Sequence, residues 1–141
     1  MQRQKPSRAK EPAAFRRLAA QHAATQALVT RLSTADVVPA VLRAVCEALH
    51  WDEAAFWWVD RDKNVLFCAD FWRSSGSTSE FETVTRDMTF APGVGLPGRV
   101  WMSGTPAWIP DVVKDRNFPR APYAAREGLH GAFGFPVTLT G

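Results

Sequence analysis

Features that define several common protein classes are scarce or missing in this chain of 141 residues. It has only two cysteines, and they do not stand at the spacing of a metal site. No apolar run approaches the roughly 18 residues of a membrane-spanning helix, and no signal-peptide core precedes a small-residue cleavage site. The H-E-x-x-H helix of metalloproteases and the G-x-S-x-G turn of serine hydrolases are absent as well. These absences predict a non-catalytic cytoplasmic domain without a metal and without membrane insertion.

The two cysteines, Cys46 and Cys68, have apolar neighbours in the sequence. We predict reduced thiols in the core, with a disulfide as the alternative. The chain length fits one domain that buries roughly two-thirds of the surface of its unfolded chain.

Positive charge gathers at one end of the chain, although the formal net charge is only +3. Residues 1–17 carry six basic side chains and one acidic side chain, whereas the remaining residues have a net charge of −2. A DNA-binding surface needs its positive charge on the folded body. We therefore expect no nucleic-acid partner, and we predict that residues 1–12, interrupted by Pro6 and Pro12, form a disordered basic leader.

Two helices are indicated by apolar residues at helical spacing. The first spans residues 13–32, where Phe15, Leu18, Leu28 and Leu32 belong to a seam close to a coiled-coil repeat. We predict that this helix forms a parallel homodimer. The second follows cap oxygens at 33–36, has Pro39 in its first turn, and carries a core stripe. That stripe consists of Val38, Leu42, Val45 and Leu49.

Strand-forming residues follow at 54–59 and 65–72, and the turn residues at 60–64 predict a hairpin between them. Gly104 is expected to end a short helix. The expected order of the remaining segments is a loop at 73–80, a strand at 81–90, a helix at 97–104, a strand at 107–109, a helical turn at 123–127 and a strand at 131–139. This order predicts an α+β domain with an antiparallel sheet.

Glycines and prolines punctuate residues 90–104 (FAPGVGLPGRVWMSG), and PAWIPDVVKDRNFPR and GLHGAFGFPV follow. In this order the motifs resemble those of a GAF domain, a small-molecule-sensing module found ahead of signalling enzymes, over residues 18–141. The resemblance implies long N-terminal helices on one face of the sheet and a pocket formed by short helices and loops on the other. It also implies a sixth strand and a closing helix. We expect both to be missing here, which would leave one sheet edge unpaired.

Gly93, Gly95 and Gly98 spell G-x-G-x-x-G, a pattern shared by dinucleotide-binding sites and protein kinases. A helix follows these glycines, the flanking strands are expected to be antiparallel, and no HRD or DFG motif occurs. We interpret the glycines as a tight strand-to-helix turn, with nucleotide phosphate binding as the alternative.

Six tryptophans and nine phenylalanines could form the core or the wall of a ligand site. Asp70 helps to decide between these two roles, because an unpaired carboxylate is costly to bury in an apolar core. The strand face that carries Asp70 and Trp72 is therefore expected to meet polar groups or water, and we assign it to the pocket. Asp111 begins a polar cluster with Asp115 and Arg116, for which turn formation is the alternative. His130 is either a packing residue or a haem ligand. The candidate pocket residues are Trp58, Asp70, Trp72, Trp101, Trp108, Asp111, Phe118, Tyr123, His130 and Phe133.

The family resemblance implies a small-molecule-sensing and dimerisation domain of a cytoplasmic signal-transduction protein, upstream of a histidine kinase or a cyclic-dinucleotide enzyme. The asparagine-lysine-phenylalanine-aspartate-glutamate signature of cyclic-nucleotide-binding members and the Cys-His pair of bilin-binding members are absent, so neither ligand is expected. No cofactor is identified. One alternative is a structural interaction module whose pocket is filled by its own tryptophans. Another is an enzyme similar to the methionine sulfoxide reductases of this fold, which rely on reactive cysteines.

Overall fold

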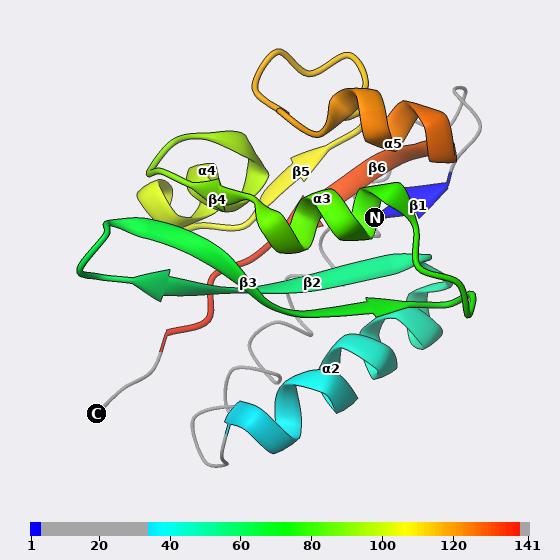
Figure 1. Cartoon of the computed structure of the whole chain (residues 1–141), viewed down its shortest axis with the longest axis horizontal. Coiled ribbons are helices and arrows are strands. Elements are labelled where there is room, and N and C mark those ends of the chain that lie inside the picture. Colours follow the sequence, from blue (N-terminus) through cyan, green and yellow to red (C-terminus); the bar gives the residue numbers. More distant parts are fainter. Residues whose placement is uncertain (4–33, 139–141) are drawn as a thin grey trace.

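The computed structural model describes residues 1–3 and 34–138 (Figure 1). The predicted helix at 13–32 and most of the predicted leader lie outside the described residues. The elements, in chain order, are β1 (Gln2–Arg3), α2 (Thr34–Leu49), β2 (Glu53–Asp60), β3 (Val65–Arg73), α3 (Glu80–Asp87), β4 (Thr89–Phe90), α4 (Gly95–Ser103), β5 (Ala107–Ile109), α5 (Ala121–Glu127) and β6 (Leu129–Gly134).

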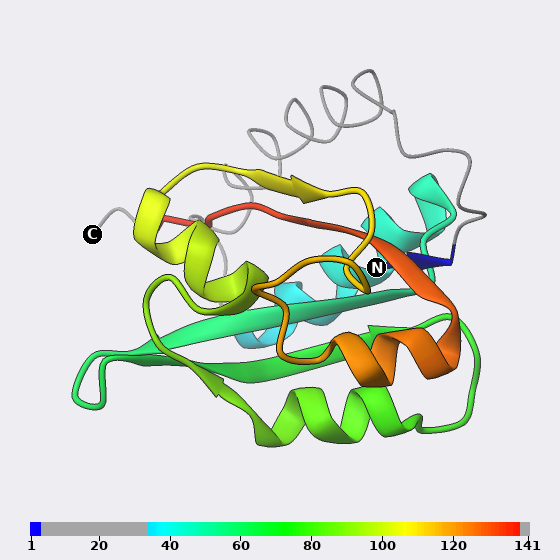
Figure 2. The same cartoon turned by 90° about the horizontal axis from the view of Figure 1, so that it is seen from above.

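The strands form two antiparallel sheets, in the orders β2-β3-β4 and β1-β6-β5. Figure 2 shows β2 between β3 and β6, so the two sheets follow one another in a twisted layer, and in Figure 1 β5 and β6 rise above the level of the β2–β3 hairpin. Helix α2 covers one face of this layer, and α3, α4 and α5 lie on the other (Figure 1). The predicted α+β class with antiparallel pairing is confirmed, and the described helices divide between the two faces as expected, with the long α2 on one and the shorter α3, α4 and α5 on the other.

The predicted hairpin is present as β2 and β3. At its turn, the Asp60 carboxylate accepts the backbone N–H groups of Asp62 and Lys63, each at 3.1 Å, and Asn64 adopts a positive φ of 53°. The register then changes along the hairpin. Phe56 lies opposite Asp70 but Trp57 lies opposite Cys68, so Ala69 is an extra residue in β3. Such a bulge exchanges the two faces of the strand, and side chains before and after it follow opposite alternations.

The strand predicted at 81–90 is wrong over most of its length. Residues Glu80–Asp87 form helix α3, and only Thr89–Phe90 are a strand. Ser79 caps the helix, because its hydroxyl accepts the Glu82 N–H at 3.0 Å. Phe81 and Thr85, one helical turn apart, then point into the core and are fully buried. Capping and burial at i and i+4 outweigh the strand propensity of this segment.

The glycine-rich segment is a turn into a helix, as predicted from the glycines. Gly95 has a φ of 66°, and a Cβ on Gly98 would lie 2.4 Å from the carbonyl oxygen of Ala91. The Gly93 N–H also donates to the Gly98 carbonyl at 2.8 Å. Helix α4 begins two residues before the expected start and ends at Ser103, with Gly104 as its left-handed cap, φ 68°.

The remaining boundaries differ little from those predicted. Strand β5 is identical, α5 extends the expected helical turn, and β6 ends at Gly134 although a strand is predicted up to residue 139. Helix α2 begins at Thr34, so Pro39 lies inside the helix and not in its first turn. Gln2 and Arg3, within the predicted leader, pair with β6 as β1.

The main core lies between the sheet layer and the helices α3, α4 and α5. Side chains from both sheets contribute to it, which ties the sheets together. Its buried members are Phe71, Phe81, Leu96, Val100, Ile109, Val112, Phe118, Ala124, Leu129 and Ala132.

Candidate functional site

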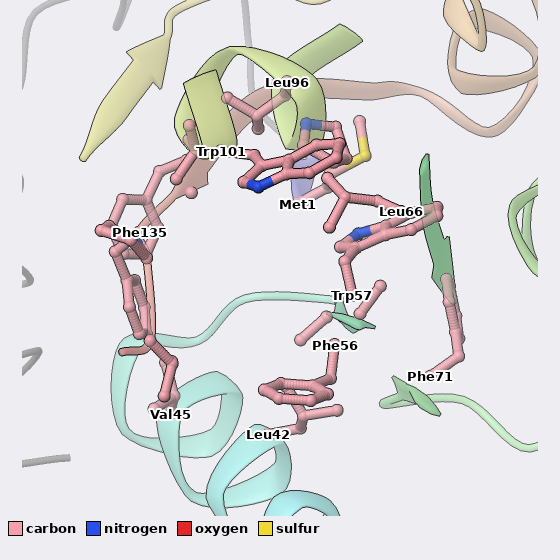
Figure 3. Close-up of a pocket in the computed structure, with 18 of the residues that line it drawn as sticks. Met1, Leu42, Val45, Phe56, Trp57, Leu66, Phe71, Leu96, Trp101 and Phe135 are labelled. Carbon is pink, nitrogen blue, oxygen red and sulfur yellow. The ribbon is translucent and has the colours of Figure 1, made fainter. Parts of the chain in front are cut away.

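A cavity of about 620 Å³ lies within the fold (Figure 3). Its size falls in the range of about 300–1,000 Å³ that is usual for small-molecule sites. In Figure 3, Leu42 and Val45 of α2 border it on one side and Leu96 and Trp101 of α4 on the other. The cavity therefore reaches both helical layers of the domain.

The cavity follows the edge of β2. Residues 53–59 of this strand all line it, whereas a strand that presented one face would contribute alternate residues. The segment 133–138, which continues β6, borders the opposite side with consecutive residues too. The space therefore lies between the two sheets, where β2 and β6 are not paired with each other.

The N-terminal residues close one end of this space. The Met1 carbonyl accepts the N–H groups of Asp52 at 3.0 Å and Glu53 at 3.2 Å, and its ammonium group donates to the Glu53 carbonyl. Burial lowers the pKa of that ammonium group. Gln2 lies opposite Gly131 of β6, so residues 1–3 bridge the two sheets at this end.

Four of the ten candidate pocket residues line the cavity. Trp101 extends from α4, Phe118 comes from the loop before α5, and Phe133 lies on β6. Trp58, on β2, is 37% exposed and lies at the rim. These aromatic side chains border the space, and the described residues leave a volume of about 620 Å³ between them.

Asp70 and Trp72 do not line the cavity, and the bulge at Ala69 explains why. Beyond the bulge the alternation of side chains between the two faces of β3 is reversed. Phe71 therefore lines the cavity, whereas in a regular strand Asp70 and Trp72 would face it. Leu66, before the bulge, lines it as well. The Asp70 carboxylate instead accepts the N–H of Phe71 at 2.8 Å, which satisfies it locally.

The other four candidates, Trp108, Asp111, Tyr123 and His130, also lie away from the cavity. Trp108 packs on Trp51 with ring centroids 5.9 Å apart, and the Tyr123 ring lies 5.4 Å from the Arg126 guanidinium. The His130 Nδ1 is 2.9 Å from the Asp111 carboxylate.

Asp111 serves the fold at this position. Its carboxylate also accepts the Val113 N–H at 3.0 Å. Partial burial acts to raise the pKa of Asp111, but the hydrogen bonds from His130 and Val113 outweigh it and hold the pKa below its ordinary value. The expected cluster with Asp115 does not form, because Asp115 binds Arg99 at 3.0 and 3.2 Å. The turn-forming interpretation fits both aspartates.

Sequence reasoning missed Arg120, the N-cap residue of α5, which lines the cavity at only 5% exposure. Its Nη1 donates to the hydroxyl of Thr85 at 3.0 Å. Burial lowers its pKa to about 10, although Cys68 and Glu53 act in the opposite direction. The guanidinium is enclosed by aromatic rings, with the Cζ atom 5.4 Å from Trp57, 5.0 Å from Phe81, 5.3 Å from Phe90 and 4.9 Å from Phe118.

Glu53 is the second buried charged residue on the cavity wall, at 1% exposure. Burial, followed by the proximity of Glu127, raises its pKa to about 7, against the opposing effect of the Met1 ammonium and Arg73. Arg73 Nε lies 3.3 Å from its carboxylate. Neither local sequence pattern nor spacing marks Glu53 or Arg120 as a site residue, because their neighbours come from distant elements.

The two cysteines are free, as predicted, with Cys46 buried and Cys68 partly buried. Burial raises the pKa of each thiol to about 11. A thiol with such a pKa is almost entirely protonated near neutral pH and is a poor nucleophile. No group of three metal-ligating side chains occurs among the described residues.

Comparison with known proteins gives one family. A family model described as a GAF domain matches residues 31–141, and no curated protein matches the chain. Within the part of the chain that the structure describes, no helix has the length and apolar character needed to cross a bilayer.

Proposed function

Because the chain belongs to the GAF domain family, we propose that it is a non-catalytic sensory domain that binds a small molecule in the 620 Å³ cavity. GAF domains are generally non-catalytic sensory modules, and the protonated thiols of Cys46 and Cys68 argue against the reductase alternative. We further propose a place in a cytoplasmic signal-transduction protein, ahead of a histidine kinase or a cyclic-dinucleotide enzyme.

The observation that carries this proposal is a cavity of ligand size bordered by two separate helices. A ligand would contact α2 through Leu42 and Val45 and α4 through Leu96 and Trp101. If the ligand binds one arrangement of these two helices more tightly than another, it increases the population of the arrangement that it prefers. Movement of α2 relative to α4 would then be the first step of the response.

Tryptophan fluorescence tests the proposal. We expect at least one compound of a library of small aromatic and heterocyclic molecules to quench the emission saturably. Trp101→Ala, which changes the cavity wall, should alter the response, whereas Trp72→Ala, a tryptophan outside the cavity, should leave it unchanged. Equal effects of the two variants would contradict binding in this cavity. So would a library without a saturable response together with native mass spectrometry of freshly purified protein that detects no small molecule.

A second candidate function, an interaction module, is favoured by the edge of β2 along the cavity. β2 pairs only with β3 among the described residues, and an extended peptide can add to such an edge as a further strand. Hydrogen exchange separates the two functions. A peptide strand would protect every second backbone amide along 54–59, those that point to the unpaired edge, whereas a small molecule would not protect such a regular series.

Homodimerisation through residues 13–32 remains part of the proposal, although this segment lies outside the described residues. Light scattering on the full chain and on a version that starts at Ser33 tests it. Loss of the dimer in the shorter version supports a role for the helix. The same oligomeric state in both versions contradicts it.

A further inference from the structure

Arg120 is a buried cation without an anionic partner in the described structure. Its side chain is 5% exposed, and no described carboxylate forms an ion pair with it. Glu53, the acidic residue on the same cavity wall, lies against Arg73 at 3.3 Å. A buried charge costs several kcal/mol unless it is paired, and arginine does not escape this cost by losing its proton.

The hydrogen bonds of Arg120 leave donors unused. One bond, from Nη1 to Thr85, is present, and the buried Nε has no acceptor. The aromatic rings around the guanidinium attract its positive charge through their faces but do not replace an in-plane acceptor. Three of these rings, those of Trp57, Phe81 and Phe118, also line the cavity. The unsatisfied cation is thus part of the cavity wall.

The geometry points to an amphipathic carboxylate as the ligand, with its acid group on Arg120 and its apolar body in the cavity; this inference rests on the proposed sensing function. A carboxylate is planar and matches the in-plane donors of a guanidinium. The neighbouring wall of Leu66, Phe71 and Leu96 suits an aromatic or aliphatic body.

The charge of the wall favours a monoanion. Arg61, the other arginine that lines the cavity, is exposed, and the Met1 ammonium already donates to the Glu53 carbonyl. Burial lowers the pKa of the Met1 ammonium, so Arg120 is the buried cation of the wall that keeps its charge, and a dianionic phosphate would also meet the acidic Glu53 in the same space. One carboxylate balances one guanidinium.

Matched acids and amides test the inference by isothermal titration calorimetry and thermal shift. The pairs are benzoate and benzamide, phenylacetate and phenylacetamide, indole-3-acetate and indole-3-acetamide, and octanoate and octanamide. Each pair has the same body and differs in charge. We expect at least one acid to bind at least tenfold more tightly than its amide, because a charge-assisted hydrogen bond is replaced by a neutral one.

Substitutions of the two cavity arginines show which of them recognises the acid group of the ligand. Arg120→Met should abolish the preference for acids, and Arg120→Lys, which keeps the charge but not the planar donors, should retain part of it. Arg61→Met is the control, because it removes an exposed arginine from the same cavity and should leave the preference intact. If Arg120→Met does not fold, the preference for acids over amides is compared between Arg120→Lys and Arg61→Met. A lower preference in Arg120→Lys supports the inference, and an equal preference in the two variants contradicts it.

Each result separates the inference from the proposed function. Amides that bind as tightly as their acids overturn the anion inference and leave the sensing function standing. A preference for acids that is lost in Arg61→Met also overturns it, since the anion would then be held at the rim. Absence of binding by every acid and amide overturns the inference, and the fluorescence test then decides separately whether the cavity binds any small molecule.

Discussion

The two sheets of the domain are stabilised in different ways. In the β2–β3 hairpin, backbone pairing runs from Glu53 opposite Arg73 to Asp60 opposite Val65. In the β1-β6-β5 sheet, β5 has three residues and β1 has two, and side chains of the adjoining loops supply the additional bonds. Asn117 bonds to Gly93 and Gly95, Arg99 to Asp115, and Asp111 to His130. Regular pairing therefore runs along the whole hairpin, whereas the pairing of the second sheet is short and individual polar contacts hold the loops around it.

This difference predicts how each half responds to substitution. Many small backbone contacts tolerate the loss of one, whereas a loop held by a few specific bonds does not. The core shared by the two sheets should be the exception, because a change there weakens both at once. The following predictions test these expectations in order of decreasing effect.

Phe81→Ala should destabilise the domain most, by about 3–5 kcal/mol, because it leaves a void where a side chain 1% exposed packs against Phe71. Urea unfolding followed by circular dichroism and by tryptophan fluorescence measures the effect. The two transitions should move together. Phe67→Ala is the control, since Phe67 is 39% exposed and its removal should cost less than about 1 kcal/mol. Separate transitions in Phe81→Ala would mean that the sheets do not share one cooperative core.

Gly98→Ala should destabilise the protein by about 1–3 kcal/mol, since the new Cβ would lie 2.4 Å from the Ala91 carbonyl oxygen. The expected site of the damage is α4 and the sheet next to it. Gly76→Ala is a matched control, because a Cβ there meets nothing within 4 Å. Hydrogen exchange should show faster exchange in α4 and β6 than in the hairpin of the Gly98 variant. Uniform acceleration would argue against local damage.

Asn117→Ala should cost about 2 kcal/mol, because it leaves two partly buried backbone groups without partners. Its side-chain amide donates to the Gly93 carbonyl at 2.8 Å, and its side-chain oxygen accepts the Gly95 N–H at 2.9 Å. Asn117→Asp keeps the acceptor and removes the donor, so urea unfolding should give it a smaller loss. A larger loss in the aspartate variant would contradict this assignment of the two bonds.

Asp111→Asn should have the smallest effect, below about 1 kcal/mol, and the effect should depend on pH. The pKa of Asp111 is lower in the folded chain than its ordinary value of 3.8. Its carboxylate therefore contributes stability above about pH 4, which is lost as the pH falls through the folded pKa. Thermal unfolding between pH 2 and 7 should give a smaller difference between variant and parent at the acidic end. A constant difference would mean that the charge of Asp111 is not involved.

The same contrast explains what could be predicted from the sequence. The hairpin was predictable because strand-forming runs and the turn residues near Asn64 are local signals. Gly104 likewise marked the end of α4. Helix α3 was missed because its decisive features, the Ser79 cap and the burial of Phe81 and Thr85, compete with a pattern that also suits a strand.

The candidate site was less predictable than the fold. The bulge at Ala69 depends on pairing with β2, so the sequence of β3 alone does not predict it. Because of this bulge, Asp70 and Trp72 lie away from the cavity. Arg120 stands in a loop segment, where a basic side chain is normally solvated. Its surroundings come from β2, α3 and β4 together with Phe118, and only the folded chain assembles them.

The open edge of β2 also has a consequence for the behaviour of the protein in concentrated solution. Residues 54–59, AAFWWV, contain no charge and no proline, the two features with which sheet edges commonly resist self-association. The charges of Glu53 and Asp60 stand only at the two ends of the strand. Among the described residues no strand pairs with this edge, so we expect aggregation to increase with protein concentration and a molecule that fills the space beside β2 to act as a solubilising agent.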